Sequence, residues 1–405
     1  MPAAELGTVE LERSVPMSGA DPLARARALQ PMLEASGPAI EQGKQLTAEV
    51  VDALVDNQLL RLLLPPSIGG GDISLPDFAE ICEAVAIGDA SAAWGVCQGN
   101  VSAMTASAYL APEVVKSFFG DRRAALAWGA RHGRAKAVIV EGGYRVTGSW
   151  DFASGNRHCT MLGAHLPAVY PDGAPRLSPE GKPEDVTVLF PHGQATVTPE
   201  WNSLGLRGTG SDIYEVNDLF VPAAHACVRD RFERRTDHRP ITAITSHLCY
   251  ATGFSATALG VARGLLNRYV ALARGKTARA GAQPMAENHC VQSEIAQLEA
   301  SLRGCRMYLL GTAREAWAEA VAQGELAMET RVALRLATTT VMRQATDVSV
   351  ACYRAGGTTA VLAANEFERR FRDAMSVSQH LQATPWPLET VGRFLLGSGE
   401  KPAFV

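Results

Sequence analysis

The most unusual short string in this chain is GSWDFASGNRH, at residues 148–158. If it lies on a strand, Trp150, Phe152 and Ser154 point to one face, because side chains alternate along a strand with a period of two. Two aromatic rings and a hydroxyl on one face suit a flat heteroaromatic ring, since the aromatics stack on it and the hydroxyl bonds to its edge. The same spacing is also typical of a strand that faces the core and ends in a turn. Periodicity alone leaves both interpretations open.

The other side chains that could carry chemistry lack the spacing it needs. The eight cysteines are scattered without a CxxC pair, so we expect reduced and mostly buried thiols rather than a disulfide framework. The histidines form no HExxH motif and no other paired spacing, so no zinc site is predicted. The glycines at 69–71 lack the GKS/T of a phosphate loop, and GLRGTGS at 205–211 lacks GxGxxG spacing. We therefore expect neither a metal nor a nicotinamide site built by this chain.

The composition indicates a folded chain with no partner attracted by charge. Hydrophobic residues make up 47% and charged residues 20% of the 405 residues, which excludes a mainly disordered chain. The formal net charge of -4 gives no electrostatic reason to expect nucleic acid or an anionic membrane as partner. No stretch approaches the about 20 apolar residues that span a bilayer, and the N-terminus lacks the apolar segment of a secretory signal. We expect a cytoplasmic protein of a microbe.

Three segments of different periodicity must position the candidate side chains. Residues 1–124 are predicted as a helical domain, in which Thr47 caps a helix whose apolar positions share one face. Residues 125–232 are predicted as a β domain, because strand-like runs follow one another without helices between them. Gly142 and Gly143 separate two of these runs as a hairpin turn. The segment therefore favours an antiparallel sheet or barrel.

Residues 233–405 are predicted as a four-helix bundle. The clearest helix runs from 289 to 323 and carries apolar or small residues at alternating spacings of four and three: Val291, Ile295, Leu298, Leu302, Cys305, Leu309, Thr312 and Ala316. This spacing is that of a seam buried against neighbouring helices. Long helices with a further apolar face usually pack against another subunit, so we expect a homo-oligomer. Clefts between domains of this kind are common sites for cofactors.

The layout resembles the acyl-CoA dehydrogenase fold, an α+β fold with an N-terminal helical domain, a middle antiparallel β domain and a C-terminal four-helix bundle. Residues 148–158 are similar to the flavin-contacting strand of one branch with this fold, the two-component flavin-dependent monooxygenases (group D hydroxylases). Residues 201–222 (WNSLGLRGTGSDIYEVNDLFVP) are similar to the next strand pair of that branch. Residues 367–380 (FERRFRDAMSVSQH) are similar to its RD-containing helix with a histidine after it. The resemblance covers residues 20–400.

The resemblance implies roles for the positions that match. Ser154 falls where the branch places a hydroxyl against flavin N5, and Phe152 falls where an aromatic packs on the isoalloxazine. Trp201 and Ser211 correspond to residues that line the flavin and its phosphate end.

The basic residue that holds the flavin phosphate is less clearly marked. Arg279 lies near the position of an arginine that reaches the phosphate across a subunit interface, which would require an oligomer, expected to be a homotetramer. A guanidinium fork suits phosphate geometry. Arg274 and Lys276 compete for this role, because the loop aligns poorly with the family.

The chain departs from true dehydrogenases at the catalytic base. Dehydrogenases of this fold abstract a proton α to a thioester with a glutamate, most often shortly after the RD of the last helix. Counting from Arg372 and Asp373 reaches His380 and Leu381, and leucine cannot accept a proton. The first bundle helix, where some members carry the glutamate instead, holds no Glu or Asp (ATGFSATALGVARGLLNRYVALAR). In the monooxygenases that this chain resembles, a histidine at this position faces the reactive edge of the flavin, where it can bond to a peroxide oxygen or take a proton.

The resemblance implies an oxygenase component with His380 and Ser154 as catalytic residues. Reduced FMN or FAD (FMNH2 or FADH2) from a separate NAD(P)H:flavin reductase would react with O2, and the C4a-hydroperoxyflavin would pass one oxygen atom to a small aromatic or heteroaromatic substrate. The alternatives are an acyl-CoA dehydrogenase or oxidase with a displaced base, an N-oxygenase of the same fold, and a flavin-binding protein without activity. Candidates for the substrate side of the pocket are Trp94, Asn100, Met104 and Trp128.

Overall fold

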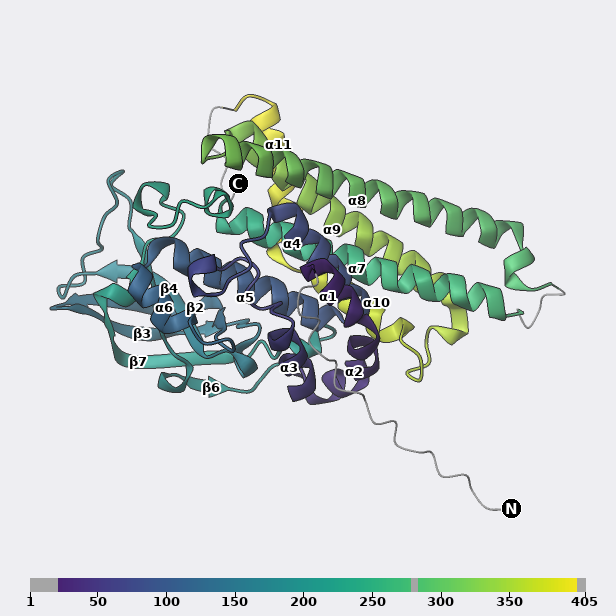
Figure 1. Cartoon of the computed structure of the whole chain (residues 1–405), viewed down its shortest axis with the longest axis horizontal. Helices are drawn as coiled ribbons and strands as arrows, with labels where there is room; N and C mark the ends of the chain where they lie inside the picture. The colour runs from purple at the N-terminus through teal and green to yellow at the C-terminus, as the bar shows by residue number, and fades with distance from the viewer. Residues whose placement is uncertain (1–20, 278–282, 399–405) are drawn as a thin grey trace, which may run out of the picture.

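The computed structural model of the chain describes residues 21–277 and 283–398, and it begins with a helical part (Figure 1). The helices of this part are α1 (Pro22–Ala28), α2 (Gln30–Gly43), α3 (Ala48–Asp56), α4 (Leu75–Gly88), α5 (Ala90–Tyr109) and α6 (Pro112–Phe119). Thr47 caps α3 as predicted, since its hydroxyl accepts a hydrogen bond from the Val50 N–H at 3.3 Å. Helix α5 is buried along nearly its whole length and contacts both β1 and α7, so it joins the sheet to the C-terminal helices.

The middle of the chain forms an eight-stranded sheet. Its strands are β1 (Leu126–Trp128), β2 (Ala130–Val140), β3 (Gly143–Asp151), β4 (Met161–Val169), β5 (Asp185–Pro191), β6 (Thr196–Thr198), β7 (Ile213–Pro222) and β8 (Ala226–Cys227). The strand order is β6-β7-β3-β2-β4-β5-β8, and β1 pairs with β4. The predicted hairpin joins β2 to β3, but its turn lies one residue earlier than expected: Val140 pairs with Gly143, and Glu141 and Gly142 form the turn.

The sheet is mixed, whereas the sequence predicted an antiparallel one. Strands β1 and β2 both pair with β4 in the parallel sense, and the remaining pairs are antiparallel. The reason is the path after β3: the chain leaves the sheet at residues 152–160 and returns on the far side of β2 as β4. Side-chain periodicity marks each strand but does not specify the order of strands.

The C-terminal part is a bundle of long helices, as predicted. Its helices are α7 (Ser246–Gly275), α8 (His289–Gln323), α9 (Met328–Gly356), α10 (Phe367–Val377) and the shorter α11 (Trp386–Leu395). Helix α8 has the predicted bounds, and its seam is buried from Leu302 to Ala316 and half-buried from Val291 to Leu298. No helix within the described residues is long and apolar enough to cross a membrane.

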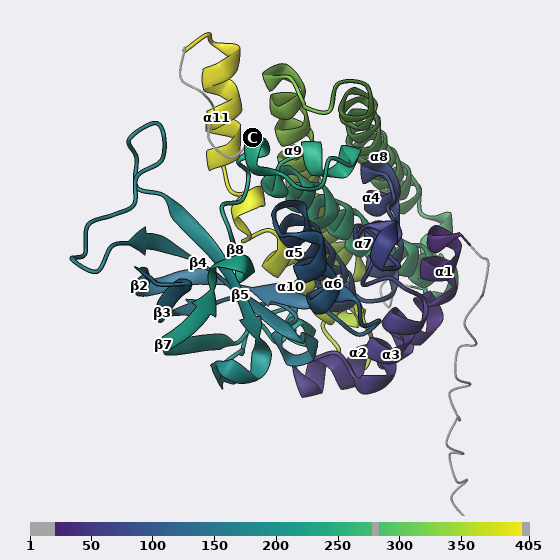
Figure 2. The same ribbon diagram turned by 60° about the vertical axis from the view of Figure 1, so that its left-hand side comes forward.

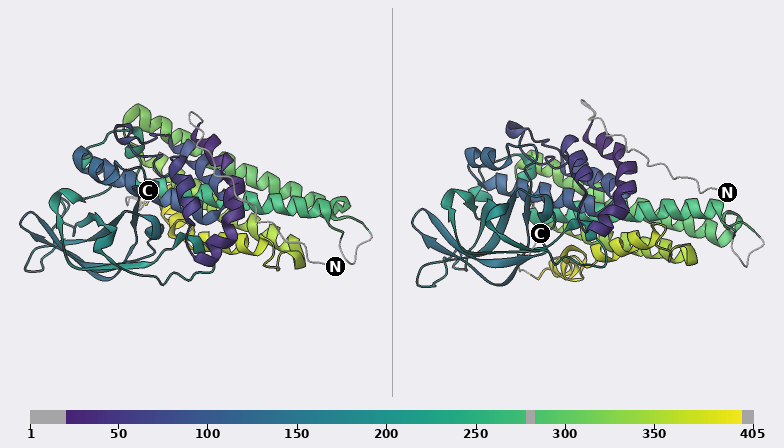
Figure 3. Two further views of the ribbon diagram at one scale, coloured as in Figure 1. Left: turned by 60° about the horizontal axis from the view of Figure 1, so that its bottom comes forward. Right: turned by 90° about the horizontal axis from the view of Figure 1, so that it is seen from below.

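The N-terminal helices and the bundle share one hydrophobic core, and the sheet has a core of its own. Helix α4 packs closely on α7, because a Cβ at Gly260 would lie only 2.3 Å from the Glu83 carbonyl oxygen. Figures 2 and 3 show the sheet standing to one side of the helices. Residues of α5 and α7, the segment after β3 and the end of α10 line one cavity beside the sheet, where the candidate site lies.

Candidate active site

A cavity of about 640 Å³ opens at the junction between the sheet and the helices. Its walls come from α5, the segment after β3, residues 201–211 between β6 and β7, α7 and the end of α10. The lining residues are Trp94, Gln98, Ala130, Phe152, Ser154, Trp201, Ser203, Leu204, Gly205, Leu206, Thr209, Ser211, Phe254, Met375, Ser376, Gln379, His380 and Leu381. None of these described lining residues is an Asp or a Glu.

The segment after β3 does not continue the strand, so the predicted common face of Trp150, Phe152 and Ser154 is wrong. Strand β3 ends at Asp151, and Phe152 takes a left-handed conformation with φ 56°, which is unusual for a residue with a side chain. Trp150 lies inside the sheet and stacks on Tyr214. Phe152 is instead 62% exposed at the cavity, and the chain then turns Ser154 into the same cavity. The interpretation as a core-facing strand therefore holds for Trp150, and the interpretation as a ring-binding site fits Phe152 and Ser154, which line the cavity.

Hydroxyl groups form a buried chain along one wall of the cavity. The Trp94 Nε1–H donates to Ser154 Oγ at 3.2 Å, and Ser154 Oγ lies 2.7 Å from Ser211 Oγ. Ser211 Oγ lies 2.7 Å from Thr209 Oγ1, which donates to the Leu206 carbonyl oxygen at 2.8 Å. The three hydroxyl side chains are all more than nine-tenths buried, so these bonds are shielded from competing water.

Residues 201–211 form a second wall, as a loop where the sequence predicted part of a strand pair. The Trp201 indole N–H donates to the Leu206 carbonyl oxygen at 3.1 Å, and the Trp201 backbone N–H donates to Asp212 Oδ1 at 3.0 Å. These bonds place the Trp201 ring edge-on to Phe152, with 5.9 Å between ring centroids. Arg157 donates to Asp212 at 2.6 Å and ties the end of the loop to the segment after β3.

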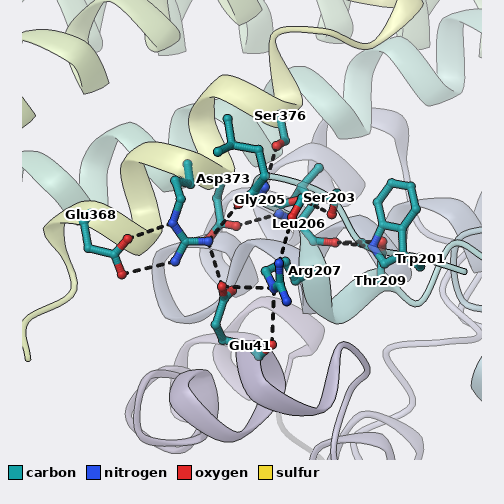
Figure 4. Close-up of polar contacts among 12 residues, drawn as sticks. Glu41, Trp201, Ser203, Gly205, Leu206, Arg207, Thr209, Glu368, Asp373 and Ser376 are labelled. Atoms are coloured by element: carbon teal, nitrogen blue, oxygen red, sulfur yellow. Dashed lines mark hydrogen bonds and ion pairs between the residues drawn. The ribbon is translucent and has the colours of Figure 1, made fainter. Parts of the chain in front are cut away.

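Helix α10 holds this loop from behind (Figure 4). The Leu206 N–H donates to Asp373 Oδ1 at 2.7 Å, and the Gly205 N–H donates to Ser376 Oγ at 2.9 Å. Loop and helix touch backbone to backbone, because a Cβ at Gly205 would lie 2.2 Å from the Arg372 carbonyl oxygen. Only glycine fits this approach.

A charged cluster secures the outer side of the same contact. Arg372 bonds to Glu368 at 2.7 Å and to Glu41 of α2 at 2.7 Å, and Arg207 pairs with Glu41 at 3.2 Å (Figure 4). Asp373 lies further inside the protein. Its burial raises its pKa to about 7, and the nearby Asp89 carboxyl contributes to this rise. The loop is thus held by an inner hydrogen-bonded carboxyl and an outer ion-pair cluster.

His380 lies after the end of α10 and also lines the cavity. Its Nδ1 accepts the Gln382 backbone N–H at 3.3 Å, and its ring packs edge-on against Trp94 and Phe254 at 5.2 and 4.7 Å. Burial, with the nearby Arg335 cation, lowers the pKa of His380 to about 4. The imidazole is therefore neutral at pH 7, and because Nδ1 is an acceptor, the proton is on Nε2.

Stacked aromatic rings form the wall beside His380. Phe254 of α7 stacks on Trp94 with 3.8 Å between ring centroids, and Tyr250 stacks on Phe254 at 5.6 Å. Leu381 lies at the cavity edge and is 48% exposed. The cavity is also lined by Gln98 and Gln379, which are polar but uncharged.

Most of the site residues predicted from the sequence line this one cavity: Phe152, Ser154, Trp201, Ser211 and His380. Their individual roles stay predictions. Arg279 lies outside the described residues. Its competitors Arg274 and Lys276 do not line the cavity, and the Lys276 ammonium donates to Thr359 Oγ1 at 2.6 Å.

Of the four residues predicted to lie on the substrate side of the pocket, one lines the cavity and three do not. Trp94 lines the cavity, but Asn100, Met104 and Trp128 do not. The Asn100 amide donates to two backbone carbonyl oxygens at 2.8 Å, which explains this buried residue as part of the helical core. Trp128 packs against His165 instead.

Sequence reasoning missed Thr209, Phe254 and the loop contact of Asp373. Thr209 lies in the GTGS string, in which only Ser211 was assigned a role by the resemblance. The hydroxyls at Thr209 and Ser211 were a usable signal, because closely spaced hydroxyls are polar groups that need partners if buried. Phe254 lies on a helix whose apolar residues all resemble core positions.

Comparison with known proteins gives this architecture a context. Residues 252–385 match the family described as "Acyl-CoA dehydrogenase, C-terminal domain". The structure of XiaF from Streptomyces sp. in complex with FADH2 and glycerol superposes with a TM-score of 0.86 at 21% identity, covering 94% of this chain and 96% of that one. The 3-HSA hydroxylase from Rhodococcus sp. RHA1 superposes with a TM-score of 0.85 at 22% identity, covering 96% and 99%. The fold is acyl-CoA dehydrogenase-like.

The relatives found by sequence are named as monooxygenases or hydroxylases, and several of these names state that the enzyme depends on a flavin. The chain is 26% identical to the indole-3-acetate monooxygenase of Pseudomonas putida, over 90% of this chain and 91% of the relative. It is 26% identical to the oxygenase component of the FADH(2)-dependent resorcinol hydroxylase of Rhizobium sp., over 92% and 93%. It is 25% identical to the oxygenase subunit HsaA of Rhodococcus jostii, over 89% and 94%.

Proposed function

We propose that this chain is the oxygenase component of a flavin-dependent monooxygenase that inserts one oxygen atom from O2 into a small aromatic or heteroaromatic substrate. The observation that carries the proposal is the make-up of the cavity. Aromatic rings, hydroxyls and a neutral histidine line it together, and none of the described lining residues is a carboxylate. The relatives named as monooxygenases support it.

The residues present fit a flavin. A volume of about 640 Å³ is within the range of about 300–1,000 Å³ usual for ligand pockets. Phe152 exposes its ring at the cavity, and Trp201 lies edge-on beside it. A flat ring system such as that of a flavin could stack on the exposed Phe152 ring. Ser154 offers a hydroxyl for the ring edge. When bound, reduced FMN or FAD supplies the electrons that activate dioxygen.

The other lining residues orient the substrate, supply a proton and exclude water from the cavity. His380 holds a proton on Nε2 and donates it as a hydrogen bond to a developing oxygen anion or to the substrate. Trp94 and Phe254 provide a stacked apolar wall for an aromatic substrate, and Leu381 shields the cavity edge from water. Arg279 remains our proposed contact for the flavin phosphate, from a neighbouring subunit.

An acyl-CoA dehydrogenase is the second candidate, and the cavity disfavours it. Such an enzyme needs a carboxylate base at the reacting carbon. Leu381 occupies the first expected position of this base, and α7, the second expected location, holds no Asp or Glu. An N-oxygenase shares every feature described above, so the nature of the atom oxidised is left to experiment.

The proposal includes a reductase, an assembly and a location. Reduced flavin comes from a separate NAD(P)H:flavin reductase, the chain assembles as a homotetramer, and it works in the cytoplasm. Support for the reductase comes from relatives named as oxygenase components and subunits. Support for assembly comes from large apolar side chains that α8 exposes, among them Met307 and Val321.

Isotope labelling tests the proposed reaction. The protein is mixed with an NADH:flavin reductase, FMN or FAD, NADH, 18O2 and a panel of indoles and phenols. We expect a product that carries one 18O atom and that does not form without the protein. Bleaching of bound FAD by acyl-CoA thioesters under anaerobic conditions, with no labelled product, would establish the dehydrogenase instead.

A further inference from the structure

The buried hydroxyl chain beside the cavity has a donor at one end and an acceptor at the other. The Trp94 indole N–H can only donate, and the Leu206 carbonyl oxygen can only accept. Between them lie Ser154, Ser211 and Thr209, each with one proton to donate. The directions of the intermediate bonds follow from these two ends.

The direction is deduced from the Leu206 end. The Thr209 hydroxyl lies 2.8 Å from the Leu206 carbonyl oxygen, and without a proton between them two oxygens at this distance would repel each other. Thr209 therefore donates its hydroxyl proton to the Leu206 carbonyl oxygen and accepts a hydrogen bond from Ser211 at 2.7 Å. Ser211 in turn accepts from Ser154 at 2.7 Å.

This direction decides what Ser154 offers to the cavity. Its proton is directed to Ser211, and one of its lone pairs receives the Trp94 N–H. The lone pair that remains is an acceptor, and Ser154 lines the cavity. A ring atom that carries N–H is satisfied there, whereas a ring nitrogen with a lone pair faces another lone pair.

We propose that Thr209 and Ser211 act as positioning residues that hold Ser154 as a hydrogen-bond acceptor and so select reduced over oxidised flavin. N5 carries N–H in the reduced ring and a bare lone pair in the oxidised ring. The inference rests on the proposed function, because it requires a flavin in this cavity. It adds the residues, outside direct contact with N5, that set the redox preference.

The far end of the chain is rigidly placed. Leu206 has a left-handed backbone with φ 52°, and its N–H is held by Asp373 on α10. Its carbonyl oxygen also accepts the Trp201 indole N–H. The acceptor that orients Thr209 is therefore part of the loop clamped by α10, and the preference for reduced flavin depends on that clamp.

Binding measurements on Thr209 variants test the inference. Dissociation constants of FMN and FAD are measured in both oxidation states, the reduced forms under anaerobic conditions. Thr209→Val keeps the shape but removes the hydroxyl, so Ser211 can turn to Ser154 and free the Ser154 proton for the cavity. We expect the ratio of oxidised to reduced dissociation constants to fall by roughly twofold to tenfold. Thr209→Ser keeps a hydroxyl and should retain the ratio of the parent.

A redox titration gives an independent readout. A tenfold fall in that ratio lowers the midpoint potential of the bound flavin by about 30 mV, since two electrons are transferred. A purely structural role of Thr209 would weaken both oxidation states together and leave the potential unchanged. Ser211→Ala breaks the chain at a second point and should lower the potential in the same direction, which keeps the test decisive if Thr209→Val does not fold.

Each failure has a distinct meaning. If the parent binds neither oxidation state of either flavin, the proposed function is wrong and the inference fails with it. If the parent prefers the oxidised form, or if folded Thr209→Val and Ser211→Ala keep the parent ratio, the inference is overturned and the proposed function stands.

Discussion

At the residue scale, the protonation of His380 decides what this cavity can do. The imidazole is neutral at pH 7 because burial lowers its pKa to about 4, and Nδ1 is occupied by a backbone N–H. A neutral ring with its proton on Nε2 is a hydrogen-bond donor and a weak acid, and it is poorly suited to abstract a proton from carbon. The residue type at this position therefore separates oxygen transfer from dehydrogenation.

Replacing His380 tests this role. His380→Ala should still bind flavin but form product roughly 10²-fold more slowly, because one positioned donor is lost. Oxygen consumption should then yield hydrogen peroxide instead of hydroxylated product. His380→Gln, which keeps a side-chain N–H, should recover part of the yield. The measurement is product formed per oxygen consumed, and full coupling in the alanine variant would contradict the assignment.

The pH dependence of coupling follows from the same pKa. Because His380 is neutral at any pH well above about 4, its protonation state does not change across the neutral range. We expect product per oxygen consumed to be constant between about pH 6 and pH 8 and to change only in acid. A sigmoidal change centred near pH 6.5, the ordinary value of histidine, that persists in Asp373→Asn, where the carboxyl with a pKa of about 7 is absent, would show that the His380 ring is not desolvated.

At the element scale, the contact between α10 and residues 201–211 joins the bundle to the sheet side of the cavity. Asp373 and Ser376 accept the two backbone N–H groups of Leu206 and Gly205. The RD string of the family resemblance, Arg372 and Asp373, thus has a structural role in this chain. Asp373 holds the loop 201–211, and Arg372 pairs with the carboxylates of Glu368 and Glu41 on the outer side of the contact.

Gly205→Ala should break this contact. The added Cβ would lie 2.2 Å from the Arg372 carbonyl oxygen, which is backbone and cannot move aside locally. We expect the loop to shift, the free energy of unfolding to fall by about 1–3 kcal/mol, and flavin affinity to fall with it. Gly193→Ala, where a Cβ meets nothing within 4 Å, is the matched control for urea unfolding and flavin titration. Equal behaviour of both variants would contradict the contact.

Asp373→Asn should alter how stability depends on pH. A carboxyl whose folded pKa is raised to about 7 binds a proton in the folded state that the unfolded state has already lost above about pH 4. Its stabilisation is therefore present in acid and lost as the pH rises through about 7. The asparagine variant is neutral throughout, so its stability relative to the parent should rise by roughly 1–3 kcal/mol from pH 5 to pH 8. Urea unfolding at both pH values checks this, and a difference that falls with pH would refute the raised pKa.

At the scale of the whole molecule, the three predicted parts meet at one cavity. The hydrophobic core is not divided in the same way as the three predicted domains. The N-terminal helices and the bundle share a hydrophobic core, and the sheet is packed separately. The domain limits at 124 and 232 therefore stay predictions. The exposed apolar side chains of α8 point to a further level of assembly.

Light scattering tests the proposed homotetramer. We expect a mass four times that of the 43.1 kDa chain. Met307→Glu on α8 should lower this mass, because Met307 is 76% exposed in the single chain and a charge would be buried in an interface. Lys116→Gln on α6, an exposed position, lowers the net charge by the same one unit and serves as the control. A monomeric parent would remove the proposed role of Arg279 across subunits.

The features that depend on local pattern and residue type could be predicted from the sequence. Alternating spacings of four and three predicted α8 with its bounds, and Thr47 was recognised as a cap. The positions of His380 and Leu381 already removed the dehydrogenase base. The first two inferences need only the burial period or the capping residue of one element, which are properties of nearby residues. The third also uses the family resemblance, which implies where a dehydrogenase base would stand.

How distant residues combine could not be predicted in this way. The parallel return of β4, the left-handed turn at Phe152 and the clamp on Leu206 all depend on the path of the chain between elements. Ser154 and Ser211 are 57 positions apart, and their hydrogen bond exists because two loops end at the same place. Periodicity reports whether a residue is buried but not which residue it meets, so the hydroxyl chain and its direction could be established only in three dimensions.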